Sequence, residues 1–97
     1  MPFVLQTTVF FITSLGENNP VLEQAIVKNF PNDYLAISPN EWLVAASGTA
    51  KNISDTLGIT DGTSGGGVVF STSGYFGRAN NQIWEWLLAK LGAVRNA

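Results

Sequence analysis

The chain has 97 residues, of which 45% are hydrophobic and 12% charged, with a net charge of −2 and neither cysteine nor histidine. This composition excludes intrinsic disorder, disulfide scaffolds, zinc sites with thiolate or imidazole ligands, and nucleophilic triads that use histidine. The five cations are spread along the sequence without forming a basic stripe, which argues against a nucleic-acid backbone as the partner.

The first third of the chain predicts a strand and a helix. Residues 3–14 are rich in Val, Phe, Ile and Thr, which suit a pleated surface. Apolar side chains lie on both faces of this strand, with Phe10 and Ile12 sharing one face, so we expect a central strand covered on two sides. Asn19 is expected to cap the helix, Pro20 to begin it, and Pro31 to stop it.

The middle of the chain predicts a hairpin and a second helix. Tyr34–Ser38 and Glu41–Ala46 alternate as strands do, and Pro39-Asn40 between them is typical of a tight turn. Ser47 or Thr49 is expected to cap the helix that follows, and Gly58 to stop it.

The last third predicts a loop, a strand and a third helix. Residues 60–67 are Gly, Thr, Ser and Asp in large part and predict the loop, and residues 68–72 predict the strand. Asn80 or Asn81 is expected to cap the helix, whose apolar face contains Ile83, Trp84, Leu87, Leu88 and Leu91.

This order of elements predicts an α+β fold of the ferredoxin-like split β-α-β type (βαββαβ) with an additional C-terminal helix, in a single domain over residues 1–97. Two helices would cover one face of an antiparallel sheet. The third helix or a second copy of the chain would cover the other face. Neither a positively charged leader nor an apolar run of membrane-spanning length occurs, so we expect a cytoplasmic protein without a membrane partner.

Two glycine-containing motifs bear on function. Residues 62–66 match the pattern G-x-S-x-G of serine hydrolases, but without a histidine base we interpret them as a loop. In Gly74-Tyr75-Phe76-Gly77-Arg78, two glycines bracket two aromatic rings and a cation follows. Backbone exposure, stacking surfaces and a guanidinium suit an anionic or planar ligand, so these five residues are the candidate ligand site.

Acidic and tryptophan residues bear on two further kinds of site, a metal centre and an interface. A magnesium-dependent nuclease needs at least two converging carboxylates, and only Asp33, Glu41 and Asp61 stand near strand ends, so we assign no catalytic residue, metal site or cofactor. Trp86 is rotated about 200° from Trp84 around the third helix and either covers a flank or meets a partner. Trp86, Phe10 and Ile12 are therefore the candidate interface residues.

The second half of the chain resembles the SinR-like family, which is related in fold to the Cas2 proteins of CRISPR systems. The resemblance covers roughly residues 41–91. It rests on Glu41-Trp42-Leu43-Val44, on Thr49-Ala50 with Ile53–Leu57, and on Trp84-Glu85-Trp86-Leu87. It implies a ferredoxin-like domain that dimerises. In Cas2-like proteins an aspartate ends the first strand and is associated with metal and nuclease activity, and the matching residues 12–15 here include no acid.

Three functions follow as hypotheses. The first is a non-enzymatic homodimeric interaction module in microbial or phage defence or counter-defence. It is suggested by the missing catalytic groups, the low charge and the two-sided first strand. The second is a weak Mg²⁺-dependent endonuclease of Cas2 type. The third is a binder of small anionic ligands such as nucleotides, with residues 65–78 as the cradle.

Overall fold

A computed structural model of the chain describes residues 7–16, 18–72, 78 and 81–91. Three helices and four strands follow one another in the order β-α-β-β-α-β-α. Their bounds are β1 (Thr8–Thr13), α1 (Pro20–Asn29), β2 (Tyr34–Ser38), β3 (Glu41–Ala46), α2 (Ala50–Leu57), β4 (Val68–Ser71) and α3 (Asn81–Leu91). The expected α+β class is confirmed. Among the described residues, no helix combines the length and apolar character needed to cross a bilayer.

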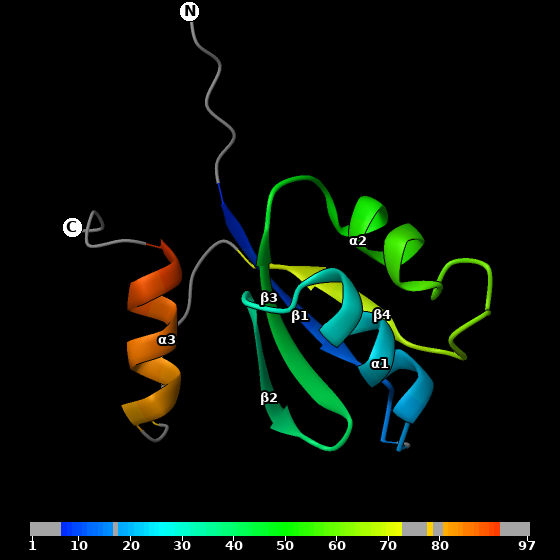
Figure 1. Ribbon diagram of the computed structural model, residues 1–97, viewed down its shortest axis with the longest axis horizontal. Coiled ribbons are helices and arrows are strands. Elements are labelled where there is room, and N and C mark those ends of the chain that lie inside the picture. Colours follow the sequence, from blue (N-terminus) through cyan, green and yellow to red (C-terminus); the bar gives the residue numbers. More distant parts are fainter. Residues whose placement is uncertain (1–6, 17, 73–77, 79–80, 92–97) are drawn as a thin grey trace, which may run out of the picture.

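The strands form one antiparallel sheet in the order β2-β3-β1-β4 (Figure 1). Both β2 and β1 pair antiparallel with β3, so β1 and β2 are parallel to each other and separated by β3. In the same way β1 separates β3 from β4. Each helix between strands, α1 and α2, therefore crosses over one intervening strand. The prediction of a central first strand is confirmed.

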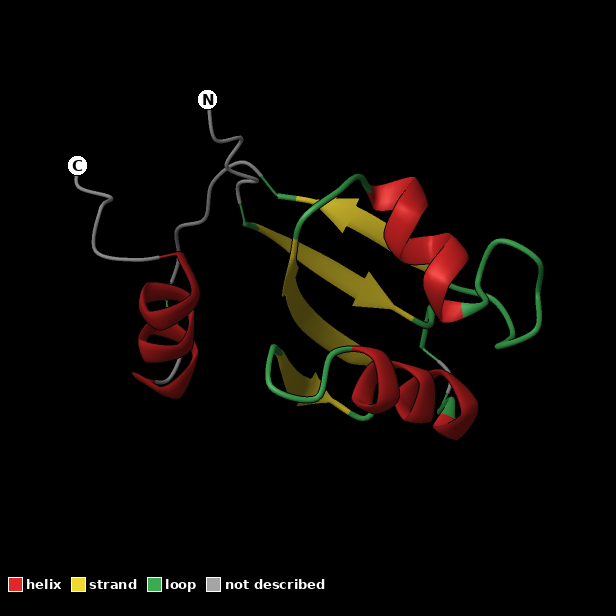
Figure 2. Ribbon diagram, turned by 45° about the horizontal axis from the view of Figure 1, so that its top comes forward, coloured by secondary structure: helices red, strands yellow, loops and turns green. Residues whose placement is uncertain are grey.

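Helices α1 and α2 pack on one face of the sheet, and α3 packs on the other (Figure 2). The cluster under α1 and α2 consists of hydrophobic residues and is closed to solvent. It consists of Phe10, Ile12, Trp42 and Val44 from the sheet with Leu22, Ile26, Ile53 and Leu57 from the helices. The cluster under α3 is smaller, with Val9, Leu43, Ala45 and Leu87 as its buried members. The apolar residues on both faces of the first strand predicted that the third helix or a second copy packs on this face, and in the structure it is the third helix.

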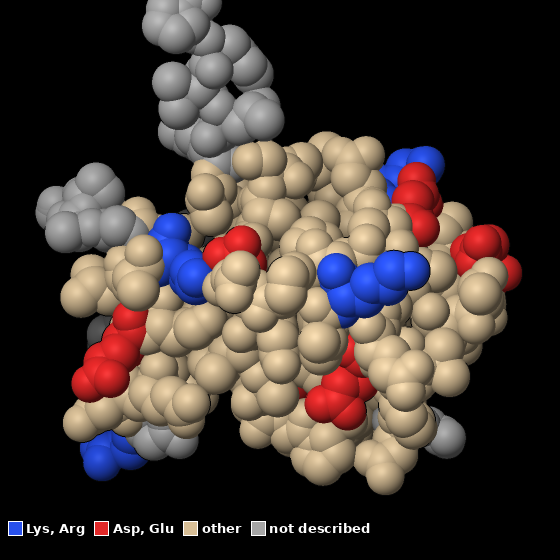
Figure 3. Space-filling model, in the orientation of Figure 1, with Lys and Arg blue, Asp and Glu red and all other residues tan. Residues whose placement is uncertain are grey.

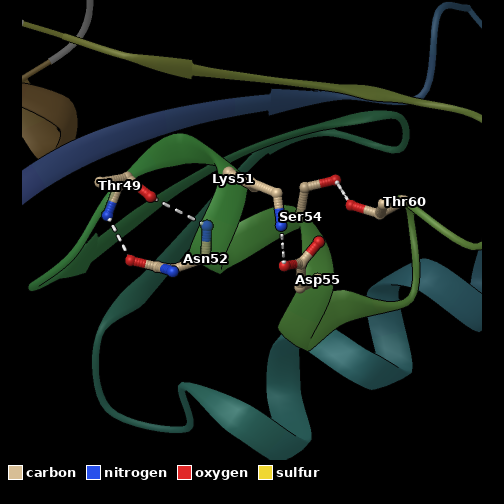
Figure 4. Close-up of polar contacts among 6 residues, drawn as sticks. All are labelled: Thr49, Lys51, Asn52, Ser54, Asp55 and Thr60. Atoms are coloured by element: carbon tan, nitrogen blue, oxygen red, sulfur yellow. Dashed lines mark hydrogen bonds and ion pairs between the residues drawn. The ribbon is translucent and has the colours of Figure 1, made fainter.

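The helix ends form where the sequence places their signals. The Asn19 side chain accepts a hydrogen bond from the Leu22 amide, and Pro20 occupies the first turn of α1. Thr49, not Ser47, caps α2, in a reciprocal arrangement with Asn52 (Figure 4). Gly58 follows α2 in the left-handed conformation (φ 79°), where a Cβ would lie 2.8 Å from the Ser64 hydroxyl. A side chain at residue 58 would therefore strain the backbone and clash.

Candidate functional site

An open hollow of about 420 Å³ lies where β1 ends, α1 begins and the glycine-rich loop before β4 passes. Segments 45 or more residues apart in the sequence meet there. Its lining is Ser14, Leu15, Asn18, Asn19, Gly65 and Gly66. Within the described part of the predicted ligand cradle, which comprises residues 65–72 and 78, only Gly65 and Gly66 contribute to this hollow.

Asn19 and Ser64 hold the walls of the hollow together. Asn19 caps α1 with its side-chain oxygen and donates from its amide nitrogen to the Ser64 carbonyl oxygen at 2.7 Å. Ser64 is buried, and its hydroxyl donates to the Leu57 carbonyl oxygen at 2.6 Å, at the end of α2. One polar chain therefore connects the start of α1, the end of α2 and the loop.

The same contacts decide the role of the G-x-S-x-G motif. The hydroxyl of Ser64 is used to fix the end of α2, and its 6% exposure leaves it out of reach of a substrate. The interpretation of residues 62–66 as a loop is confirmed. Their serine is a structural residue that satisfies a helix carbonyl, as buried polar groups must.

The lining of the hollow is uncharged as far as the structure describes it. These residues offer amides, a hydroxyl and backbone groups but neither a carboxylate nor a cation. Ser14 is buried, and its hydroxyl donates to the Asn40 carbonyl oxygen at 3.4 Å. An anionic ligand would find no Lys or Arg side chain among the described lining residues, and none of these residues is a general base.

The three acids considered for a metal lie apart. Asp33 precedes β2 and pairs with Lys90 of α3 at 2.9 Å, whereas Glu41 begins β3 and accepts from Ser38 at 3.2 Å. Asp61, in the loop after α2, accepts from the Thr63 amide at 2.9 Å. Among the described residues, no three side chains of a metal-ligating type gather around one point.

Two carboxyls have lowered pKa values, one in the last turns of α2 and one in the loop that follows this helix. A hydrogen bond from Thr60, followed by the hydrogen bond and charge of Lys51, lowers the pKa of Asp55 below its ordinary value. The backbone and side chain of Thr63 lower the pKa of Asp61 in the same way. Figure 4 shows Lys51 reaching Asp55 one turn along α2, and Ser54 meeting Thr60. These shifts come from turn and helix contacts on the surface, not from a buried catalytic pair.

The predicted interface residues divide between the two cores. Phe10 and Ile12 are fully buried between the sheet and the helices α1 and α2, so neither has surface to offer a partner. The strand pattern identified them as buried, but their cover is the chain's own helices. Trp84 and Trp86 both pack, half-buried, against the cluster under α3. Trp86 thus covers a flank of that cluster.

Of the predicted ligand residues, Gly74, Tyr75, Phe76 and Gly77 lie outside the described residues, and Arg78 is exposed. The prediction of a site there stays a prediction.

An apolar surface that the sequence reasoning missed lies at the β4 edge of the sheet. Phe70 is 51% exposed and Val68 is 37% exposed, and both lie on the face that α3 only partly covers. Phe11 of β1 contacts Phe70, with ring centroids 6.1 Å apart. We call Phe11, Val68 and Phe70 the β4 strip. Its signal in the sequence is the run Val68-Val69-Phe70, which puts apolar side chains on both faces of the strand.

Charged groups are sparse on the face of the molecule that Figure 3 shows. Figure 3 shows Lys, Arg, Asp and Glu scattered over the visible face, with wide uncharged areas between them. Low charge with exposed aromatic and aliphatic side chains is typical of surfaces that contact other proteins.

Comparison of the chain with family models, with curated proteins and with solved structures gave no match. The resemblance of residues 41–91 to the SinR-like family therefore stays an expectation from the sequence.

Proposed function

We propose that the chain is a non-enzymatic interaction module with a ferredoxin-like fold that acts as a homodimer. Two observations support the fold. Each of its two β-α-β units is split by an intervening antiparallel strand, and the sheet read from the other edge is β4-β1-β3-β2. The additional helix α3 then lies on the face that two-layer versions of this fold leave open.

The β4 strip is the observation on which the homodimer rests. In the monomer, the half-exposed side chains of Phe70 and Val68 leave apolar area in contact with water. Burying this area in a dimer interface would lower the free energy. The hollow at the start of α1 is a weaker basis for function, because its described lining residues include no charged group that would position an anionic nucleotide. A panel of nucleotides in a thermal-shift assay tests that alternative, and binding would raise the melting temperature.

The resemblance to the SinR-like family extends the proposal to a cytoplasmic protein of microbial or phage defence or counter-defence. We do not propose a Cas2-like nuclease, because Asp33, Glu41 and Asp61 each bond to different partners and do not converge on one point.

The homodimer is tested by sedimentation velocity across a concentration series. The 10.4 kDa chain is expected to move from monomer towards twice that mass as the concentration rises. A monomer at every concentration would overturn the homodimer. Cleavage of RNA or DNA with Mg²⁺ that is lost in Asp33→Ala, Glu41→Ala or Asp61→Ala would overturn the non-enzymatic part.

A further inference from the structure

The two edges of the sheet differ in how they are protected. The β2 edge has a register irregularity between Ala36 and Ser38, and a proline follows it. Bulges and prolines are features that keep edge strands from pairing with other chains. Over its described residues the β4 edge has neither of them, and the four residues of the strand, Val68–Ser71, include no charge.

The backbone of β4 has hydrogen-bonding groups directed away from β1. The Thr72 amide donates to the Val9 carbonyl oxygen at 3.0 Å, so these two residues form a hydrogen-bonded pair of the ladder. Such pairs alternate along an antiparallel ladder, and Phe70 and Val68 are the next two that bond towards β1. The N–H and C=O groups of Val69 and Ser71 therefore point to the outer edge, where no described strand pairs with them.

We propose that two copies of the chain pair along β4, antiparallel about a twofold axis at Val69, so that Val68 of each faces Phe70 of the other. This inference rests on the proposed homodimer and names its surface. The result is an eight-stranded sheet with an isologous interface, in which one patch meets itself.

Symmetry and the apolar pattern fix this register. A twofold axis perpendicular to the sheet keeps each face on its own side, so residues can pair only with residues that point the same way. Centring the axis on Val69 bonds the outward groups of Val69 to those of the partner's Val69. It also places Val68 opposite the partner's Phe70, where side chains of a non-hydrogen-bonded pair approach closely. Centring it on Phe70 would instead leave Val68 opposite a threonine.

Charge and area argue for a second copy that binds weakly. Because β4 is uncharged, pairing two copies along it brings no like charges of this strand face to face. An aromatic side chain buries 150–250 Å², so each half-exposed Phe70 adds about 100 Å². A contact limited to the β4 strip falls short of the roughly 1,200–2,000 Å² of stable complexes. The dimer is therefore expected to be weak, with a monomer–dimer equilibrium that depends on protein concentration.

Charged and proline variants test the surface by sedimentation. Phe70→Lys is expected to weaken dimerisation at least tenfold, whereas Leu88→Lys, at a side chain of similar exposure on α3, leaves it unchanged. Ser71→Pro removes an outward N–H without removing a β1–β4 hydrogen bond, so it is expected to fold and stay monomeric. Circular dichroism of each variant separates loss of pairing from loss of folding.

Cysteine pairs test the register, and the natural chain contributes no cysteine of its own. Under mild oxidation, a mixture of Val68→Cys and Phe70→Cys is expected to give more disulfide dimer than either variant alone. Val27→Cys, exposed on α1, serves as the control. A stronger dimer from Phe70→Cys alone would overturn this register. A wild-type dimer that Phe70→Lys and Ser71→Pro leave intact would overturn the surface and leave the homodimer standing. A wild-type monomer would overturn both.

Discussion

The two faces of the sheet are built from the same strands but closed to different degrees. Under α1 and α2, the large side chains Phe10, Ile12, Trp42 and Val44 have no exposed surface. Under α3, small residues such as Ala45 are buried, while Phe70 at the edge stays half-exposed. The two helices α1 and α2 together shield their face of the four-stranded sheet from solvent, whereas α3 alone leaves part of the other face exposed. Stability is therefore expected to come from the first face and interaction from the second.

The largest expected effect comes from the closed face. Phe10→Ala should lower the free energy of unfolding by about 3–5 kcal/mol, because it removes a fully buried ring and leaves a cavity. Urea denaturation measures the loss. The matched control is Phe70→Ala, the same substitution on the open face, with an expected change within about 0.5 kcal/mol. Equal losses at the two positions would contradict the difference between the faces.

A smaller effect is expected for the helix on the open face. Leu87 is the buried residue of α3, and Leu87→Ala should cost about 2 kcal/mol, the low end for such truncations, because the cluster around it is small. Leu88→Ala, one residue along and 57% exposed, is the control and should change little. Trp84 and Trp86 lie beside this cluster, so tryptophan fluorescence reports whether α3 loosens. A loss at Leu88 as large as that at Leu87 would mean that α3 packs through another side.

The closed face contains one imperfection that can be removed. The Trp42 Nε1 group is buried and has no hydrogen-bond partner among the described residues. An unsatisfied buried donor costs about 1–3 kcal/mol, which offsets much of what the larger ring gains by packing. Trp42→Phe is therefore expected to stay within about 1 kcal/mol of the natural chain, whereas Trp42→Ala should lose about 3–5 kcal/mol. A loss in Trp42→Phe as large as in Trp42→Ala would show that the indole nitrogen is satisfied.

The smallest effect is expected from the ion pair that joins α3 to the sheet. Lys90 donates to Asp33 at 2.9 Å and to the Asn32 carbonyl oxygen at 2.7 Å, with its side chain 25% exposed. Lys90→Met should cost about 0.5 kcal/mol, and salt should reduce the difference. Lys51→Met breaks a more exposed pair within α2 and should change stability less. A larger loss in Lys51→Met would contradict this order.

Local signals in the sequence predicted the helices and strands. Which element packs on each face of the sheet had to come from the structure. The hairpin strands Tyr34–Ser38 and Glu41–Ala46 and the caps Asn19 and Gly58 depend on turn and capping residues within a few positions, and all four are confirmed. Alternation identified Phe10 and Ile12 as buried. It could not say whether a helix or a partner buries them, because a period of two records which face a side chain is on and not what lies against it.

The hollow could not be predicted for a related reason. It joins residues 14–19 to Gly65 and Gly66, and the distance between these segments is set by how α1 and α2 pack. The loop composition of residues 60–67 predicted a turn-rich segment there. The bond from Asn19 to Ser64, which shapes the hollow, spans 45 positions and leaves no local pattern.

The place of α3 after β4 in the chain order has a consequence for folding. The closed face is formed by β1 to β4 with α1 and α2 and includes no residue of α3, so these elements can assemble before α3 docks. Until α3 docks, Val9, Leu43 and Ala45 face water. A chaperone that transiently shields apolar sheet surfaces would have its opportunity to act on this protein in that interval.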